Sequence, residues 1–339
     1  MSAAVWQSAG IALVAAFVLT PLVRGYSRRR GLIDRPDARR SHRAPVARGG
    51  GLAISIALLS TVLAFAPDDA LVLPFSVGAA IVSLLGWRDD HAPLSVRWRL
   101  GIQIFVAAGI IAWLGPVESI DVGRRTIAAP WLWTPLAIIA MVWLMNLFNF
   151  MDGSDGLAST QAVISFTLFA LGFGLAGENA AAWLAAVCAG ASMGFLFWNW
   201  PGASIFLGDS GSLLLGWGAG AFALAGTLTG SVSVWLAFII VSPFVVDATL
   251  TLCWRLMRGE RWYTAHKDHA FQCLIRLGWS HGQVLLVWIA LNFLLVVPAT
   301  LVAFWKPQVE TGAAAVLSVF LAGVWCVVRF VVAKERVTT

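Results

Sequence analysis

The stretch "WLWTPLAIIAMVWLMNLFNFMDGSDGLA", residues 131–158, decides the fold. Residues 131–148 are almost entirely apolar and approach the ~20 residues that a helix needs to cross a bilayer. Asparagines, aspartates and glycines follow this apolar run. The stretch therefore predicts a membrane-spanning helix that ends in a polar loop.

The composition extends this prediction to the whole chain. The 339 residues are 59% hydrophobic and 12% charged, and the mean hydropathy is +0.82. Soluble domains carry about 25% charged residues, and no polar stretch here is long enough for a separate soluble domain. Because lipid cannot satisfy an open backbone, we expect an all-α polytopic membrane protein that forms one domain over residues 1–339.

Eleven membrane-spanning segments are expected along the chain. Their predicted positions are 4–23, 51–66, 70–87, 100–115, 131–148, 160–177, 180–198, 211–227, 231–253, 283–304 and 312–332. An odd number of spans places the two termini on opposite sides of the membrane.

The basic residues predict the orientation. With the N-terminus outside and the C-terminus in the cytoplasm, all but Arg124, Arg125 and Lys306 of the 23 basic residues lie inside, as the positive-inside rule requires. The net charge of +6 then follows mainly from topology, and it indicates no nucleic-acid partner. Five inner segments are expected to build one site, namely 24–50, 86–99, 146–159, 198–212 and 254–282.

The first inner loop reads "GLIDRPDARRSHRAPVARGGG", residues 31–51. Guanidinium groups such as that of Arg48 bind phosphate oxygens, and a glycine run at a helix start lets backbone N–H groups approach an anion. His42 lies in the same loop. The alternative is that the arginines only anchor the loop to anionic lipid headgroups.

The adjacent carboxylates Asp89 and Asp90 lie in "GWRDDHAPLS", residues 86–95. Two neighbouring carboxylates repel each other unless a cation or proton lies beside them. They predict a metal-neighbouring or proton-accepting pair, unless Arg88 simply balances their charge.

Four oxygen-bearing side chains, Asn146, Asn149, Asp152 and Asp155, lie where the apolar run 131–148 ends. Carboxylate and amide oxygens suit Mg²⁺, which also keeps several waters. A helix cap is the alternative, although one cap needs only one such residue. For Asn146 the expected role is only to hold the loop in shape.

The segment "FWNWPGASIFLGDSGSLLLG", residues 197–216, places Asp209 between small residues just before a span. Asp209 is either a site carboxylate or an ordinary N-cap. Asn199 ends the preceding span, and Phe206 could either stack on a base or be buried in the protein.

The last inner loop contains "RWYTAHKDHAFQCL", residues 261–274. His266 and His269 have i, i+3 spacing, so a helix would place both on one face. A third zinc ligand in suitable spacing is missing, and phosphate contact fits these histidines better. Asp247 lies within a predicted span and is therefore a functional candidate.

These motifs together resemble the polyprenyl-phosphate N-acetylhexosamine-1-phosphate transferases. The motifs that carry the resemblance occur in family order: "DRPDARRSHRAPVARGGG", "RDDHAPLS", "NLFNFMDGSDGLA", "NWPGASIFLGDSGSLLLG" and "AHKDHAFQ". The resemblance implies an enzyme of the bacterial inner membrane with its active site facing the cytoplasm. It implies transfer of a sugar-1-phosphate from a UDP-N-acetyl sugar to undecaprenyl phosphate, with release of UMP.

The resemblance also implies roles for individual residues. Asn149 and Asp209 would hold Mg²⁺, for which Mn²⁺ could substitute, and Asp152 would support the metal and sugar-phosphate region. The remaining implied contacts are Asp89 and Asp90 near the lipid phosphate, Asp155 and Phe206 at the uracil, and Asn199, His266, His269, Arg48 and His42 at the substrates. Whether Asp89 is a base, a nucleophile or an orienting group stays open.

The motifs are closest to those of enzymes that start O-antigen and related lipopolysaccharide glycans. The last-loop histidines are less tightly clustered than in the phospho-MurNAc-pentapeptide transferase of peptidoglycan synthesis, which stays an alternative. A transporter or flippase is the rival class, but it would need polar groups reaching both membrane faces or the midplane. The sequence leaves open a homo-oligomer and the choice of N-acetyl sugar.

Overall fold

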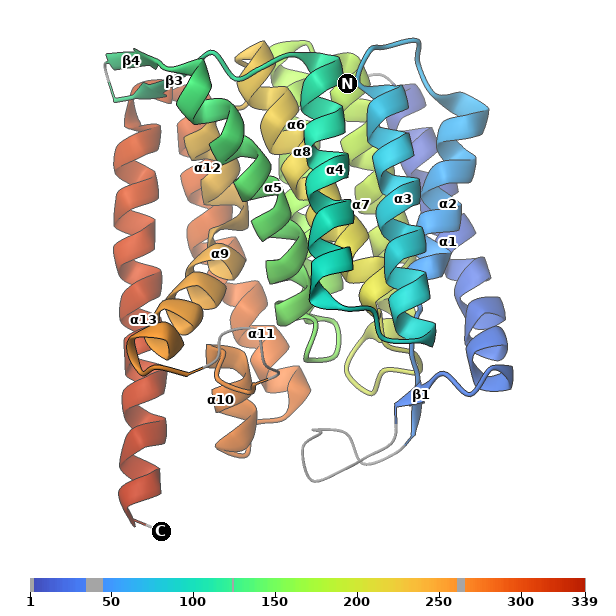
Figure 1. Ribbon diagram of the computed structural model, residues 1–339, viewed down its shortest axis with the longest axis vertical. Coiled ribbons are helices and arrows are strands. Elements are labelled where there is room, and N and C mark those ends of the chain that lie inside the picture. Colours follow the sequence, from blue (N-terminus) through green and yellow to red (C-terminus); the bar gives the residue numbers. More distant parts are fainter. Residues whose placement is uncertain (1–2, 35–44, 124, 261–265, 339) are drawn as a thin grey trace.

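The computed structural model describes residues 3–34, 45–123, 125–260 and 266–338. The chain forms a bundle of long helices that run up and down, with small β-pairs near the two ends (Figure 1). Within the described residues, ten helical segments are long and apolar enough to cross a membrane. The prediction of an all-α polytopic membrane protein is thereby confirmed.

The elements follow the order expected from the sequence. The transmembrane helices and their connecting elements are α1 (Ala3–Arg29), β1 (Ile33–Asp34), β2 (Val46–Ala47), α2 (Gly51–Phe65), α3 (Val72–His91), α4 (Val96–Leu114), β3 (Ser119–Val122), β4 (Arg125–Ala128), α5 (Pro130–Met151), α6 (Leu157–Ala176), α7 (Asn179–Asn199), α8 (Asp209–Thr229), α9 (Val234–Met257), α10 (Ala270–Arg276), α11 (His281–Leu291), α12 (Val297–Trp305) and α13 (Glu310–Thr338).

Two predicted spans differ from simple straight helices. Helix α2 has 15 residues, and it is therefore shorter than the ~30 Å hydrocarbon core at 1.5 Å per residue. The span predicted at 283–304 is α11 and α12 joined by a π-helical turn, Asn292–Val296. Pro298 follows this turn near the start of α12, and its missing N–H interrupts the α-helical hydrogen bonding.

Helix α8 lies at the centre of the bundle and packs against α3 and α5. A Cβ at Gly216 would lie 2.5 Å from a backbone atom of α5, so the two helices touch directly. On α3, Gly78 makes room for Trp217, which is fully buried and donates to the Phe75 carbonyl at 3.1 Å. Small residues therefore let α8 pack tightly, as is common in membranes.

The two chain ends lie at opposite ends of the bundle (Figure 1). The β3–β4 pair lies at the end where the chain begins, whereas β1 and α10 lie at the other end. The loops before α6 and α8 reach this second end too, so the predicted inner motifs gather there. That this end faces the cytoplasm stays a prediction from the charge distribution.

Candidate active site

The start of α8 is held by a carboxylate from α3. The Asp90 side chain accepts from the backbone N–H groups of Asp209 and Ser210, at 3.1 and 3.2 Å. Arg48 donates to the same carboxylate through Nε and Nη2, at 3.1 and 2.9 Å. An anion at a helix N-terminus is favoured by the free N–H groups and the helix dipole. Asp90 thus fixes the first inner loop and α8 around one point.

Asp89 points to a different set of partners. It accepts from the Leu94 backbone N–H at 2.5 Å and from Arg99 Nη1 at 2.8 Å. Arg88 instead donates to the Ala92 carbonyl. The alternative that Arg88 balances the acidic pair is therefore wrong; Arg99 and Arg48 do so.

The glycine run before α2 has a packing role. Gly50 N–H donates to the Phe206 carbonyl and Gly51 N–H to the Leu207 carbonyl, at 2.9 and 2.8 Å. A Cβ at Gly51 would lie 2.0 Å from the Gly211 Cα. The expectation that these N–H groups receive an anion is wrong for both residues, because backbone carbonyls already occupy them.

Asn149 and Asp209 meet where α5 ends and α8 begins. Asn149 Nδ2 donates to Asp209 Oδ1 at 2.9 Å and to Ser212 Oγ at 3.0 Å. Gly208 is the N-cap of α8, and this N-cap position makes no side-chain capping hydrogen bond. Asp209 is therefore not the N-cap considered as an alternative, and its carboxylate faces Asn149 and, at 3.7 Å, Arg99.

Asp152 lies in the acidic part of the site, near Asp209. Burial and the nearby charge of Asp209 raise the pKa of Asp152 to about 8, although the Gly208 N–H favours the carboxylate. The described residues contain no cluster of three or more His, Cys, Asp or Glu side chains placed to hold a metal. Mg²⁺ commonly takes one or two carboxylates and completes its shell with water and phosphate, so the Asp152–Asp209 pair suits it.

Asp155 and Asn199 tie the loops together. Asp155 Oδ2 accepts from the Gly202 and Ala203 N–H groups, at 3.0 and 3.2 Å. Asn199 is buried, accepts from the Gly156 N–H at 3.1 Å and donates to the Ile205 carbonyl at 3.1 Å. Both side chains thus make contacts that shape the loops, and their predicted substrate contacts stay predictions.

His266 and His269 do not share a helix, contrary to the prediction, because α10 begins only at Ala270 with His269 as its N-cap. Their rings nevertheless lie 5.0 Å apart. His269 Nδ1 lies 3.7 Å from Asp247, whose carboxylate accepts from the Ala270 N–H. Burial and the neighbouring His269 and Arg255 lower the pKa of His266 to about 4, so its imidazole is neutral at physiological pH.

Two cavities border these groups. The polar pocket, of about 290 Å³, is lined by Asp34, Arg48, Asp152, Gly153, Ser154, Asp155, Asn199, Phe206, Gly208, Asp209, Lys267, Gln272, Ile275 and His281. The apolar groove, of about 810 Å³, is lined by Val96, Arg99, Leu100, Ile104, Pro135, Ile138, Ile139, Val142, Trp143, Asn146, Asn149, Phe150, His266, His269 and Gln272.

The two cavities meet at one place. Gln272 lines both, and Asn149 of the groove bonds to Asp209 of the pocket. Of the predicted site residues, only His42 lies outside the described residues. Asn146 lies within α5 and donates to Gln103 of α4 and to the Val142 carbonyl, both at 2.7 Å, so it joins two helices, and the expectation that it shapes the loop is not confirmed.

Sequence reasoning did not single out Arg99, Gln272 or His281. The backbone N–H of Asp155 donates to His281 Nδ1 at 3.1 Å. Since a backbone N–H can only donate, a neutral His281 carries its hydrogen on Nε2. That atom is buried and has no hydrogen-bond partner among the described residues. His281 therefore holds a buried, unpartnered N–H donor in a ring that lines the polar pocket.

The fold and this pair of cavities are those of a multi-pass membrane protein, and comparisons with known proteins show its family. Residues 72–227 match the model of glycosyl transferase family 4. The chain is 30% identical over 294 residues to the probable undecaprenyl-phosphate N-acetylglucosaminyl 1-phosphate transferase of Bacillus subtilis, covering 85% of this chain and 82% of that one.

Two further relatives cover most of the chain. A decaprenyl-phosphate N-acetylglucosaminephosphotransferase of Mycobacterium tuberculosis is 27% identical over 348 residues, 92% of this chain and 86% of its own. A phospho-N-acetylmuramoyl-pentapeptide-transferase of Symbiobacterium thermophilum is 30% identical over 300 residues, with coverages of 81% and 87%. The chain belongs to the polyprenyl-phosphate N-acetylhexosamine-1-phosphate transferases of this family.

Proposed function

We propose that this enzyme transfers an N-acetylhexosamine-1-phosphate from a UDP-sugar to undecaprenyl phosphate. An oxygen of the lipid phosphate bonds to the β-phosphorus of the UDP-sugar. The bond from that phosphorus to the bridging oxygen breaks, and UMP leaves. The product is the first lipid-linked intermediate of a cell-envelope glycan, of the O-antigen type by motif resemblance.

The observation that carries this proposal is the junction of the two cavities at Asn149 and Asp209. The apolar groove suits a prenyl chain, since apolar residues of α4 and α5 line most of it. The polar pocket suits a nucleoside diphosphate sugar, since acidic, basic and amide side chains line it. A lipid phosphate at the polar end of the groove would therefore meet the diphosphate where the two spaces join.

Within this junction the chain's own residues bind and orient the reactants. Arg48 and Lys267 line the pocket and suit the donor diphosphate, whereas Arg99 lines the groove and suits the acceptor phosphate. Asp89 orients the Arg99 guanidinium at 2.8 Å, and Asp90 orients that of Arg48 at 2.9 Å. We infer that the acidic pair acts mainly by holding the arginines, because a lipid phosphate is already mostly ionised at neutral pH.

We also propose that the carboxylates of Asp209 and Asp152 and the side-chain amide oxygen of Asn149 hold Mg²⁺, with Mn²⁺ as a substitute. Bound there, the ion would neutralise the phosphoryl oxygens during the transfer. The support is that two carboxyl groups line the same polar pocket and that one of them, Asp209, contacts the Asn149 amide.

The site is proposed to face the cytoplasm of a bacterial inner membrane. The support is the concentration of basic residues at the end that carries the site loops. A UDP-sugar made in the cytoplasm would then reach the pocket without crossing the membrane.

A second candidate donor is UDP-MurNAc-pentapeptide, because one relative carries that activity in its name. The transporter considered as a rival is disfavoured, since the relatives across most of the chain are transferases.

The test is a donor panel with purified protein, undecaprenyl phosphate and Mg²⁺. The panel contains UDP-GlcNAc, UDP-FucNAc, UDP-QuiNAc and UDP-MurNAc-pentapeptide, and the readouts are UMP and the lipid product. We expect one N-acetylhexosamine donor to give both products in equal amounts. The absence of UMP with every donor would reject the proposal, and turnover with the pentapeptide donor alone would select the second candidate.

A further inference from the structure

A third cavity lies outside the catalytic junction, where the end of α9 meets α10 and α13. Its volume is about 410 Å³, and its lining is Trp254, Arg258, Asp268, Arg276, Arg329, Phe330 and Val332. We call it the arginine cavity. None of these residues lines the polar pocket or the apolar groove.

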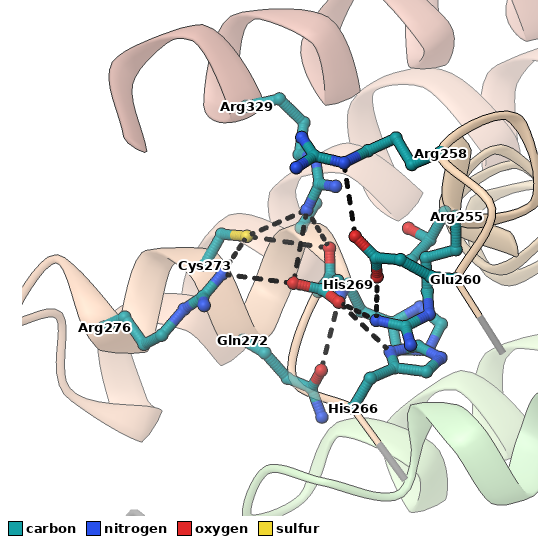
Figure 2. A network of polar contacts seen from close by, with 12 residues as sticks. Arg255, Arg258, Glu260, His266, His269, Gln272, Cys273, Arg276 and Arg329 are labelled. Carbon is teal, nitrogen blue, oxygen red and sulfur yellow. Dashed lines mark hydrogen bonds and ion pairs between the residues drawn. The ribbon is translucent and has the colours of Figure 1, made fainter. Parts of the chain in front are cut away.

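The arginine cavity carries an excess of positive charge (Figure 2). Arg255 contacts Glu260 and Asp268, and Arg258 Nε contacts Glu260 at 3.2 Å. The Asp268 carboxylate also has Arg276 and Arg329 at 3.8 and 3.9 Å, respectively. Of the charged side chains that line the cavity, three are arginines, Arg258, Arg276 and Arg329, and one is a carboxylate, Asp268. An anion inside the cavity would balance the remaining charge.

Arg329 has donor capacity left for such an anion. Its Nη1 donates to the Asp268 carbonyl at 2.6 Å, and its guanidinium carbon lies 3.6 Å from the Trp254 ring centroid. Its Nη2 is buried and has no hydrogen-bond partner in the described part of the chain. Arg258 stacks on the same ring at 4.5 Å. Stacked guanidiniums with unused N–H groups are suited to phosphate oxygens.

The surroundings of the arginine cavity are apolar and face outward. Phe330 is 72% exposed, and Met257, beside the cavity at the end of α9, is 79% exposed. Both lie on apolar helices of membrane-spanning length. Exposed apolar side chains at the rim of a cationic cavity fit a ligand whose phosphate continues into acyl chains.

We propose that the arginine cavity binds the phosphate of an anionic phospholipid in the leaflet on the side of the catalytic loops. The lipid's phosphodiester lies among Arg258, Arg276 and Arg329, and its acyl chains run along α9 and α13. Because Asp268 lies 3.9 Å from His266, which lines the apolar groove, a bound lipid also steadies one wall of that groove.

Native mass spectrometry of the full-length, delipidated protein tests this site directly. Phosphatidylglycerol and phosphatidylcholine with identical acyl chains are titrated separately, and soluble glycerol 1-phosphate is added as a competitor. We expect roughly tenfold tighter binding of phosphatidylglycerol, because its headgroup is anionic whereas that of phosphatidylcholine is zwitterionic. Glycerol 1-phosphate should not compete at concentrations that match the lipid.

The double variant Arg258→Gln/Arg276→Gln should lose this preference. Both side chains are partly exposed, at 59% and 33%, so their replacement should leave the fold intact. Arg24→Gln is the matched control, because Arg24 also stacks on a tryptophan, Trp198, at 5.2 Å, and it does not line this cavity.

Three outcomes would overturn the proposal. Equal binding of the two lipids to the wild-type protein would show that the cavity does not select anionic headgroups, and this comparison needs no variant. An equal loss in Arg24→Gln would indicate a general charge effect. Competition by glycerol 1-phosphate at the lipid's own affinity would identify a site for free phosphate compounds.

Discussion

The polar pocket and the apolar groove share a border, yet different kinds of side chain line them. Charged and amide side chains on loops line the pocket, whereas aliphatic and aromatic side chains of α4 and α5 line most of the groove. The pocket is therefore shaped by hydrogen bonds such as those of Asp155, and the groove by helix spacing. The contrast teaches that changes in one cavity should affect one substrate, and that only changes at the junction should affect both.

The largest effect is expected at the junction itself. Asp209→Asn removes the carboxylate that Asn149 contacts, and we expect kcat to fall about 10³-fold, because electrostatic groups at a reacting phosphate contribute effects of this size. Steady-state UMP release at saturating substrates is the measurement.

Ser212→Ala is the control for Asp209→Asn. It removes only the second acceptor of Asn149, at 3.0 Å, and should reduce kcat by roughly tenfold or less. If Asp209→Asn kept more than a tenth of wild-type turnover, the junction would not be the reaction centre.

The next effect concerns the groove alone. Ile139 lines the groove and is 62% exposed, so Ile139→Trp should fill the space without disturbing the core. Losing about 2 kcal/mol of apolar burial would raise the KM for undecaprenyl phosphate roughly 30-fold. The KM for the UDP-sugar should not change.

Leu63→Trp provides the comparison for the groove variant. Leu63 lies on α2, is 91% exposed and does not line the groove, so both KM values should stay at wild-type levels. A change in the donor KM of Ile139→Trp would contradict the separation of the two cavities.

A pair of substitutions at His281 sharpens the description of the pocket. The side chain in His281→Asn keeps a hydrogen-bond acceptor near the position of Nδ1. The side chain in His281→Gln keeps an N–H group near the position of Nε2. If the Nε2–H group contacts the UDP-sugar, His281→Asn should raise the KM for the UDP-sugar about tenfold, and His281→Gln should raise it less. The acceptor KM serves as the internal reference. The opposite order would assign His281 only the support of Asp155.

The smallest effect is a pH dependence of stability at the groove wall. The pKa of His266 is about 4 in the folded protein and ~6.5 in an unfolded chain. Between these values the unfolded chain binds more protons, so stability should fall as the pH decreases from about 6.5 toward 4. His266→Gln should reduce this fall in Tm by roughly 2–4 °C. Identical Tm-versus-pH curves for both proteins would contradict the assignment.

Helix positions and the grouping of motifs could be predicted from the sequence because both depend on hydropathy and charge. The run 131–148 is apolar whatever its neighbours are, and α5 covers it. Partners across the fold could not be predicted this way. Asp90 accepts hydrogen bonds from Arg48, which is 42 residues away in the sequence, and from the backbone N–H of Asp209, which is 119 residues away. No local pattern predicts these bonds.

Local patterns also misled where one residue type serves two purposes. The glycine run at 49–51 is typical of an anion-binding loop, but packing against α8 explains it here. His266 and His269 have helical spacing, yet His269 ends the loop as an N-cap. The weak signal for His281 was its position beside Ser280, the N-cap of α11, which could mark a helix start near the site.

The contact between Gly51 and Gly211 has a consequence for mutational screens. A Cβ at Gly51 would lie 2.0 Å from Gly211, and one at Gly86 would lie 2.3 Å from the Asp209 carbonyl oxygen. Alanine at either position would push α8 out of place and abolish activity as completely as the loss of Asp209 itself. Activity-based selection would therefore record structural glycines and chemical aspartates as one class, and only the amount of folded protein in the membrane would separate them.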